Sequence, residues 1–238
     1  MIKKKFEKHP FYGVMRMLEW LRQDKGIKVN KKRIERLYRE LGLRAIIPKK
    51  NLSKSNESHE KYPYLLRDLQ IDRVNQVWET DITYLPMRSG FIYLTAIIDV
   101  YSRYIVGWSV SNTMSADWCQ AVMEKAVEKY GKPEIVNTDQ GSQYTSAVFI
   151  DYLKTESIQI STDEKGRALD NIYIERFWRT VKYEDFYLKS YENGLELYHG
   201  MRDYFNFYNR ERRHQSLNYS TPCEVFFEQK KKELKSVS

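Results

Sequence analysis

The chain has 238 residues and a net charge of +8, and 42% of its residues are hydrophobic, which is enough to build a packed core. No apolar run approaches the roughly 18 residues that a membrane-spanning helix needs, and the start, MIKKKFEKHPFYG, lacks the apolar core of a signal peptide. Cys119 and Cys223 lie too far apart to suggest a metal-binding pair or a disulfide framework. These features exclude a membrane protein and a disulfide-rich secreted protein, and they favour a cytoplasmic protein of one or two domains.

Positive charge is concentrated in the first quarter of the chain. Residues 1–60 contain 17 Lys and Arg against 7 Asp and Glu, whereas residues 61–238 contain 23 against 25. This asymmetry predicts a module that binds a polyanion, most simply a nucleic acid, attached to a nearly neutral body. A basic arm that only keeps the protein soluble is the alternative.

Two short helices are expected within residues 1–48. Residues 11–24 and 29–42 both repeat apolar side chains every three or four positions, and Asn30 is placed to cap the second helix. Two helices joined by a tight turn, the second strongly basic, predict a helix-turn-helix DNA-binding segment, with a helical hairpin that has a solvated charged face as the alternative. The candidate DNA contacts on the second helix are Lys31, Lys32, Arg33 and Arg36.

A polar stretch without periodicity begins at residue 49, and we expect residues 49–70 to be a linker. Three strand-like runs then predict an antiparallel meander, and the later strands alternate with helices as in a parallel sheet. The expected strands are 77–85, 91–100, 104–111, 134–139 and 158–162. The expected helices are 115–130, 145–157, 170–187 and 191–209. This order predicts an α/β, ribonuclease-H-like domain over residues 71–227, in which helices flank a mixed five-stranded sheet, followed by a basic tail at 228–238.

Two acidic residues lie where a strand should be apolar or should end. Asp81 is inside the first expected strand, and Asp139 ends the fourth. The first and fourth strands are neighbours in a ribonuclease-H-like sheet, so the two carboxylates would approach and repel each other. A divalent cation removes that repulsion, and oxygen ligands suit magnesium or manganese. The two acids are therefore candidate metal ligands.

The helix expected at 170–187 offers a third acid. Its apolar face consists of Ile174, Phe177 and Val181. Glu175 lies on the other side, and Arg179 and Lys182 lie near its line, since seven positions are nearly two helical turns. A carboxylate beside two cations suits a surface that binds metal and faces phosphate.

Each acid taken alone has a simpler interpretation. Asp81 could be a buried acid with satisfied hydrogen bonds, and Asp139 could be a turn former. Glu175 could be one half of an i,i+4 ion pair with Arg179. Their joint placement on one expected fold makes the metal site the stronger interpretation.

The spacing and order of these motifs resemble a known family. Thirty-five residues separate Asp139 from Glu175, which resembles the DDE signature of retroviral-type integrases and bacterial transposases. The segments WETDITYL, IIDVYSRYIVGW, TDQGSQYTS, LDNIYIERFWRTVK and YNRERRHQSLNYSTP, in this order, resemble the catalytic (second reading frame) polypeptide of insertion-sequence transposases of the IS-three family. The openings HPFYG and VNKKRIERLYRELGLRA resemble that family's helix-turn-helix segment, so the likeness extends over about residues 9–227.

The resemblance implies a DNA transposase that catalyses metal-dependent strand cleavage and strand transfer at insertion-sequence ends. It makes Asp81, Asp139 and Glu175 the ligands of two Mg²⁺ ions, for which Mn²⁺ can substitute, and it implies that Lys182 contacts the transposon-end DNA. The implied partners are double-stranded DNA of the terminal inverted repeats and the target, and further copies of the chain in a homo-oligomer on nucleoid DNA. A fused upstream reading frame is a further expected partner, because the chain begins close to the helix-turn-helix. YGVMR at 12–16 departs from the family's frequent YGYRR, which puts a DNA contact there in doubt.

A second basic cluster near the end of the chain contains Arg210, Arg212, Arg213 and His214. We interpret the three arginines, and Arg179 on the acid-bearing helix, as DNA contacts. The alternative is a solvated charged face in which His214 makes a structural hydrogen bond.

Two other functions remain open at this point. A DNA-binding regulator would keep the basic N-terminal module and use an inert ribonuclease-H-like body, although nothing would require such a body to retain all three acids. A ribonuclease-H-type nuclease would act on RNA–DNA hybrids, but the N-terminal module and the ordered motifs argue against it.

Overall fold

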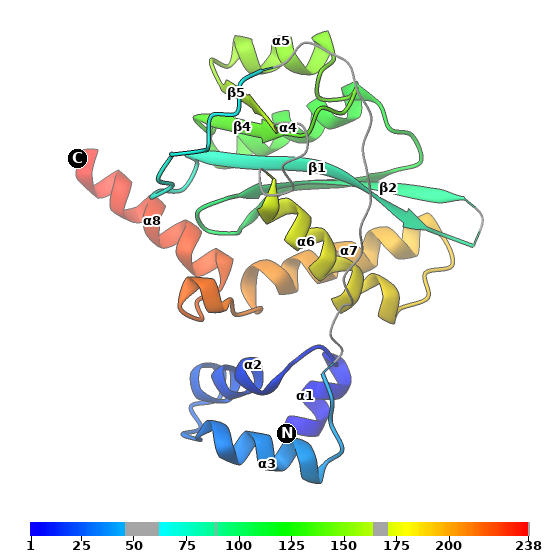
Figure 1. Ribbon diagram of the computed structural model, residues 1–238, viewed down its shortest axis with the longest axis vertical. Coiled ribbons are helices and arrows are strands. Elements are labelled where there is room, and N and C mark those ends of the chain that lie inside the picture. Colours follow the sequence, from blue (N-terminus) through cyan, green and yellow to red (C-terminus); the bar gives the residue numbers. More distant parts are fainter. Residues whose placement is uncertain (46–61, 89, 164–170, 238) are drawn as a thin grey trace.

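The computed structural model describes residues 1–45, 62–88, 90–163 and 171–237, which form a small helical domain and a larger α/β body (Figure 1). The body is built on a five-stranded sheet with the order β3-β2-β1-β4-β5. The strands are β1 (Val77–Pro86), β2 (Phe91–Asp99), β3 (Ile105–Ser111), β4 (Ile135–Thr138) and β5 (Gln159–Thr162). All five predicted strands are confirmed, each to within one residue at either end.

The sheet is mixed, as predicted. β1 pairs with β2 in antiparallel fashion, and β2 pairs in the same way with β3. β1 also pairs with β4 in parallel, from Val77 opposite Ile135 to Thr80 opposite Thr138, and β4 pairs in parallel with β5. Because β1 and β4 run side by side in the same direction, the residues that follow Thr80 and Thr138 emerge next to each other.

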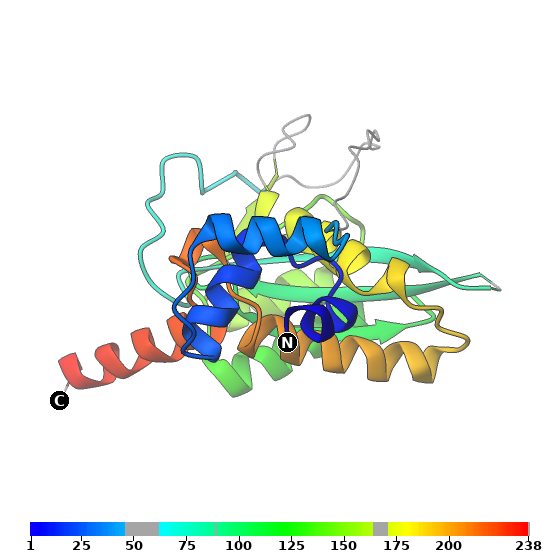
Figure 2. The same ribbon diagram turned by 90° about the horizontal axis from the view of Figure 1, so that it is seen from below.

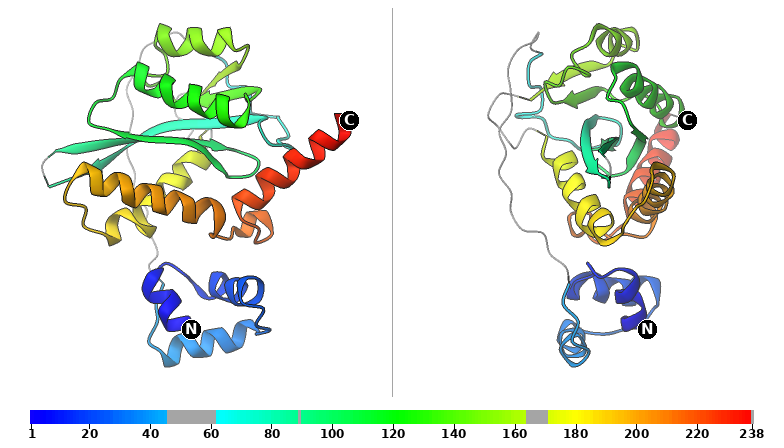
Figure 3. Two further views of the ribbon diagram at one scale, coloured as in Figure 1. Left: turned by 180° about the vertical axis from the view of Figure 1, so that it is seen from behind. Right: turned by 90° about the vertical axis from the view of Figure 1, so that its right-hand side faces the viewer.

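Helices cover both faces of the sheet (Figure 3). α4 (Ala116–Tyr130) and α5 (Ala147–Thr155) pack on one face, around a core that includes Trp78, Met123 and Leu153. α6 (Ile172–Glu184) and α7 (Gly194–Arg210) pack on the other face, around a core that includes Leu94 and Phe177. Short 3-10 turns at Phe186–Leu188 and Gln215–Leu217 flank α7, and α8 (Pro222–Val237) ends the described chain. The apolar face predicted for α6 is buried as expected.

The N-terminal domain contains α1 (Ile2–Lys8), α2 (Val14–Glu19) with a π-helical turn (Trp20–Asp24), and α3 (Lys31–Glu40). α3 confirms the second predicted helix, because the Asn30 side chain accepts a backbone N–H of its first turn at 2.9 Å, and Ile34 and Tyr38 are buried. α1 lies outside the predicted helices, and the helix expected from residue 11 begins at Val14. Pro10 separates the two helices, because a proline disfavours helical backbone geometry at the residue before it.

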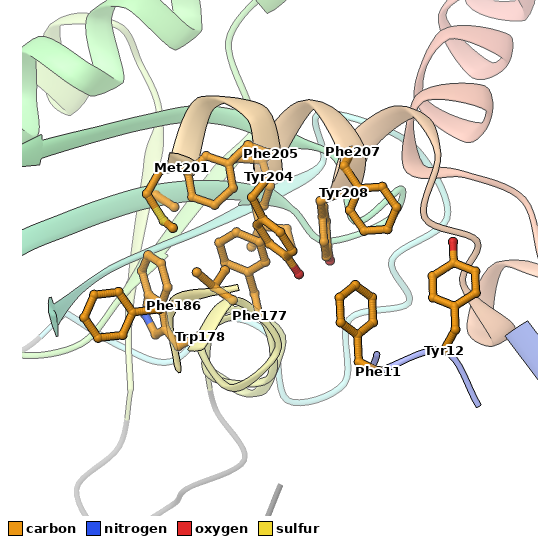
Figure 4. Close-up of a cluster of buried hydrophobic side chains, with 14 of the residues drawn as sticks. Phe11, Tyr12, Phe177, Trp178, Phe186, Met201, Tyr204, Phe205, Phe207 and Tyr208 are labelled. Carbon is orange, nitrogen blue, oxygen red and sulfur yellow. The ribbon is translucent and has the colours of Figure 1, made fainter. Parts of the chain in front are cut away.

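The helical domain packs against the α6–α7 side of the body (Figure 2). Phe11 and Tyr12 belong to the same buried cluster as aromatic side chains of α6 and α7 (Figure 4). His9 stacks on Phe207 of α7 with 4.5 Å between the ring centroids. Aromatic pairs of this kind add stability beyond the area that they bury. The two domains therefore share one core and hold a defined relative position.

Two predicted boundaries change. Residues 62–70 lie on the body rather than in a linker, since the Leu65 amide donates to Ser161 Oγ of β5 at 3.0 Å and Tyr62 packs against the core. Residues 46–61 lie outside the described residues, so the earlier part of the 49–70 linker stays a prediction. The boundary at 227 is wrong, because α8 continues through it to Val237, anchored by the buried Phe226. Along the described ranges, no helix is long and apolar enough to span a membrane.

Candidate active site

Asp81 lies in the middle of β1, on the strand that is shared by the antiparallel and parallel halves of the sheet. Its carboxylate Oδ2 accepts a hydrogen bond from Trp178 Nε1 of α6 at 2.8 Å. Its backbone carbonyl accepts a hydrogen bond from Thr95 Oγ1 of β2 at 3.1 Å. The residue is thus held both by the sheet and by the facing helix.

Asp139 follows directly after β4 and begins a tight turn. Its Oδ1 accepts the backbone N–H of Gly141 at 2.9 Å, the local hydrogen bond that an aspartate makes in such turns. A Cβ at position 141 would lie only 2.9 Å from the same Oδ1, so the close approach of backbone and carboxylate depends on glycine. The turn therefore fixes the direction of the Asp139 side chain.

The two aspartates are close enough to affect each other. Burial, together with the charges of Asp139 and Glu175, raises the pKa of Asp81 to about 7, although the hydrogen bond from Trp178 partly offsets these effects. Burial also raises the pKa of Asp139, which the N–H of Gly141 partly offsets. Two neighbouring carboxylates repel each other when no cation is present. A divalent cation bound between them therefore stabilises the site.

Glu175 lies in the first turn of α6, on the exposed side of that helix, and partial burial raises its pKa. Its charge is one of those that raise the pKa of Asp81, which places it toward the two aspartates. In the part of the chain that the structure describes, however, no three Asp, Glu, His or Cys side chains lie close enough to hold one metal ion. The structure brings the two aspartates together and sets Glu175 on the facing helix, so coordination by all three acids requires a further approach of α6 or its side chain.

The donor set fits a hard divalent cation. The three acids offer carboxylate oxygens, which are the ligands that Mg²⁺ and Mn²⁺ prefer. Their mutual repulsion at Asp81 is an independent sign that the site is suited to positive charge.

Two residues that support the site escaped the sequence analysis. Glu79, two positions before Asp81 on β1, is 1% exposed, and its Oε2 accepts the backbone N–H groups of Tyr173 and Ile174 at the start of α6. Trp178 is the donor to Asp81. Glu79 carries the same sequence signal as Asp81, an acid inside a buried strand, and that signal could have identified it.

The predicted cations divide into groups. The four cations predicted on α3 are all exposed: Lys31, Lys32, Arg33 and Arg36. Two of them form i,i+4 ion pairs, Lys31 with Glu35 and Arg36 with Glu40. Arg179 is exposed on α6. Burial lowers the pKa of Lys182 while the charge of Asp81 raises it, which places this lysine beside the acidic site. Arg210 is exposed at the end of α7. These positions leave the candidate contacts on α3 and α6 and at Arg210 accessible to a ligand.

The prediction for Arg212 is wrong. This side chain is 5% exposed, and its Nε and Nη2 both donate to the carboxylate of Glu184 at 2.8 Å. Arg213 is also engaged, because its Nε donates to Asp24 of the helical domain at 3.1 Å. A run of basic residues in sequence does not show which side chains point inward, and these two partners are far away along the chain. Both arginines are structural links rather than free cations.

The geometry defines an integrase-like core: a mixed sheet with two aspartates meeting at adjacent strands and a glutamate on the facing helix. The similarities to known proteins agree. Residues 72–168 and 156–222 match two family models that are both described as an integrase core domain, and residues 1–51 match an HTH-like domain.

Relatives and solved structures point the same way. The transposase for insertion sequence element IS904 of Lactococcus lactis is 35% identical over 231 residues, covering 93% of this chain and 90% of the relative. Transposase InsF for IS3A of Escherichia coli is 32% identical over 209 residues, covering 85% and 72%. The catalytic core of HTLV-2 integrase, solved in complex with magnesium, shares the fold with a TM-score of 0.53 at 20% identity, covering 65% of this chain and 97% of that one. A chain of a simian T-cell lymphotropic virus intasome has a TM-score of 0.58 at 14% identity, covering 87% and 73%.

The chain belongs to the transposases of bacterial insertion sequences, the family that includes the IS3 transposase InsF, within the DDE integrase superfamily. It is a DNA transposase and a DDE polynucleotidyl transferase, and nothing in these similarities favours an inert regulator or a ribonuclease-H-type nuclease. The fold implies the use of divalent metal, and the HTH-like domain implies DNA binding.

Proposed function

We propose that Asp81, Asp139 and Glu175 are the catalytic residues and that they hold two Mg²⁺ ions, for which Mn²⁺ can substitute. The observation that carries the proposal is the meeting of two mutually repelling carboxylates at adjacent strands, with the glutamate of α6 facing them. Ions held by these three carboxylates would supply activation of the attacking oxygen and stabilisation of the leaving 3′-oxygen of a phosphodiester.

The chain's own residues orient the DNA for that reaction. In cleavage, a water oxygen bonds to the scissile phosphorus as the bond to the 3′-oxygen breaks, which leaves a 3′-hydroxyl at the element end. In strand transfer, the oxygen of that hydroxyl bonds to a target phosphorus as the bond from this phosphorus to its 3′-oxygen breaks, so the target strand leaves with a 3′-hydroxyl and no bond to the protein is formed. Lys182 and Arg179 lie on the Glu175 side of α6, where their charges would hold the phosphates on either side of the scissile bond.

DNA recognition falls to the helical domain in this proposal. The four exposed cations of α3 are placed to contact the terminal inverted repeats of the element, and Arg210 offers a further phosphate contact. We further propose that the protein acts on nucleoid DNA as a homo-oligomer that pairs two element ends. A segment from an upstream reading frame is a proposed fusion partner.

Strand cleavage on the element's own ends tests the proposal. Labelled duplexes with the flanking inverted repeats would be incubated with the full chain and Mg²⁺ or Mn²⁺, and products resolved on denaturing gels. Glu175→Gln and Asp139→Asn should abolish nicking and end joining while DNA binding in gel shifts is retained. Asp151→Asn, which removes an exposed acid on α5, is the matched control and should behave as wild type. Cleavage that survives Glu175→Gln, or that proceeds in EDTA, would sink the proposal.

A further inference from the structure

Within the described residues, the first turn of α6 is capped from a distant strand. Its N-cap residue, Asn171, makes no side-chain hydrogen bond to the helix, although the first N–H groups of any helix need acceptors. Glu79 of β1 supplies them instead, with Oε2 accepting the N–H of Tyr173 at 3.0 Å and of Ile174 at 2.9 Å.

A second link joins the same strand to the same helix about one turn later. Trp178 is 6% exposed, and its Nε1 donates to Asp81 Oδ2 at 2.8 Å. Glu79 and Asp81 are two positions apart on β1, so both side chains point to the α6 face of the sheet.

The spacing of the two links matches on the strand and on the helix. Two strand residues rise about 6.8 Å, and the four to five helical positions from Ile174 and Tyr173 to Trp178 rise about 6–7.5 Å. Both links are present together in the structure. Glu175 lies between the two points at which α6 is held.

We propose that Glu79 and Trp178 are positioning residues that hold α6 on β1 at two points and thereby set Glu175 relative to Asp81. This inference rests on the proposed function of the three acids. It gives Trp178 a second role, because a hydrogen bond from an outer partner fixes the orientation of a ligating carboxylate. Loss of such an outer partner typically lowers metal affinity or activity about 10- to 100-fold.

Trp178→Phe is the decisive variant, because it keeps an aromatic ring and removes the N–H donor, and the loss of ring volume is matched in a second tryptophan. Trp118→Phe is its matched control: Trp118 is a partly buried indole on α4 whose Nε1 donates to Ser109 Oγ at 3.0 Å. For the cap, Glu79→Gln keeps an acceptor oxygen, whereas Glu79→Leu removes it.

Two measurements on the full chain would be compared. The first is the rate of strand cleavage at saturating DNA as a function of Mg²⁺. The second is the rise in melting temperature with Mg²⁺ in the absence of DNA, which reports metal binding without turnover. Trp178→Phe and Glu79→Leu should each raise the half-saturating Mg²⁺ concentration about 10- to 100-fold in both measurements. The KM for DNA should stay unchanged, Glu79→Gln should recover most of the loss, and Trp118→Phe should match wild type.

The inference is overturned if Trp178→Phe has the same Mg²⁺ dependence as Trp118→Phe while Asp81→Asn is inactive. If Asp81→Asn itself cleaves normally, the proposed function fails instead, and the two failures are thus distinguishable. Should Glu79→Leu not fold, as judged by its melting curve without metal, Trp178→Phe alone decides the matter.

Discussion

The buried ion cluster between the helical domain and the body is the feature whose disruption we expect to cost most stability. Glu184, near the end of α6, accepts four hydrogen bonds: two from Arg212, one from Arg16 Nη1 at 2.6 Å and one from the Tyr204 hydroxyl at 3.0 Å. Burial alone would raise the pKa of Glu184, but the guanidiniums of Arg212 and Arg16 hold it below its ordinary value. The carboxylate is therefore ionised and depends on its partners.

Arg212→Met removes the better-buried partner and leaves a similar volume of apolar side chain. Removing one member of a buried ion pair typically costs about 3–5 kcal/mol, because the remaining charge stays buried. Arg16 is partly exposed and still neutralises Glu184, so we expect the lower end, about 3 kcal/mol. Chemical unfolding followed by tryptophan fluorescence measures this change in the free energy of unfolding.

Arg202→Met provides the control for that measurement. Arg202 pairs with Asp203 at 3.0 Å on the surface, so its loss should change stability by less than about 0.5 kcal/mol. The effect of Arg212→Met should also shrink in acid, since protonation of Glu184 removes the unpaired buried charge. The native pKa of Glu184 is lowered, so its contribution to wild-type stability is complete above the ordinary value of 4.5 and is lost as pH falls through the native pKa. A loss below about 1 kcal/mol that does not vary with pH would refute the reasoning.

Two further changes follow from single contacts. Gly141→Ala places a methyl group 2.9 Å from Asp139 Oδ1 and should displace that carboxylate. Strand cleavage should then slow about 10- to 100-fold, with little change in the affinity for DNA measured by gel shift. An unchanged cleavage rate would show that the turn accommodates the methyl group without moving the carboxylate. Burial lowers the pKa of His9 to about 3, so below its ordinary 6.5 the unfolded state binds a proton that the folded state refuses, and stability falls with pH from about 6.5 toward 3. His9→Phe keeps an aromatic ring against Phe207 and should reduce by one the number of protons taken up on unfolding in this pH range, as measured by unfolding at a series of pH values.

Local patterns were sufficient for the sheet and the candidate acids. The strands of the body alternate or run apolar over several residues, and turn residues separate them, so their order could be derived without tertiary information. Asp81 and Asp139 stood out because each interrupts or ends such a run. The side of α6 that carries Glu175 followed from the spacing of its buried residues.

The remaining features depend on partners that are distant in sequence. Arg212 looks like any exposed arginine until Glu184, 28 positions earlier, is seen to bind it, and Arg16 reaches the same carboxylate from 168 positions away. The cap of α6 by Glu79 crosses 94 positions. No periodicity encodes such pairs, which arise only when the sheet and helices have packed.

α6 connects the candidate chemistry to the DNA-binding domain. Its first turn is held by Glu79 and carries Glu175, and its last residue, Glu184, is bound by Arg16 of the helical domain. Glu184 lies nine positions after Glu175, a rise of about 14 Å along a stiff helix. The helical domain is thus held directly against the helix that carries the proposed catalytic glutamate. Arg16→Met, which removes this contact, should weaken the coupling between DNA binding and cleavage while leaving the Mg²⁺ dependence of the melting temperature unchanged, whereas Trp178→Phe should do the reverse.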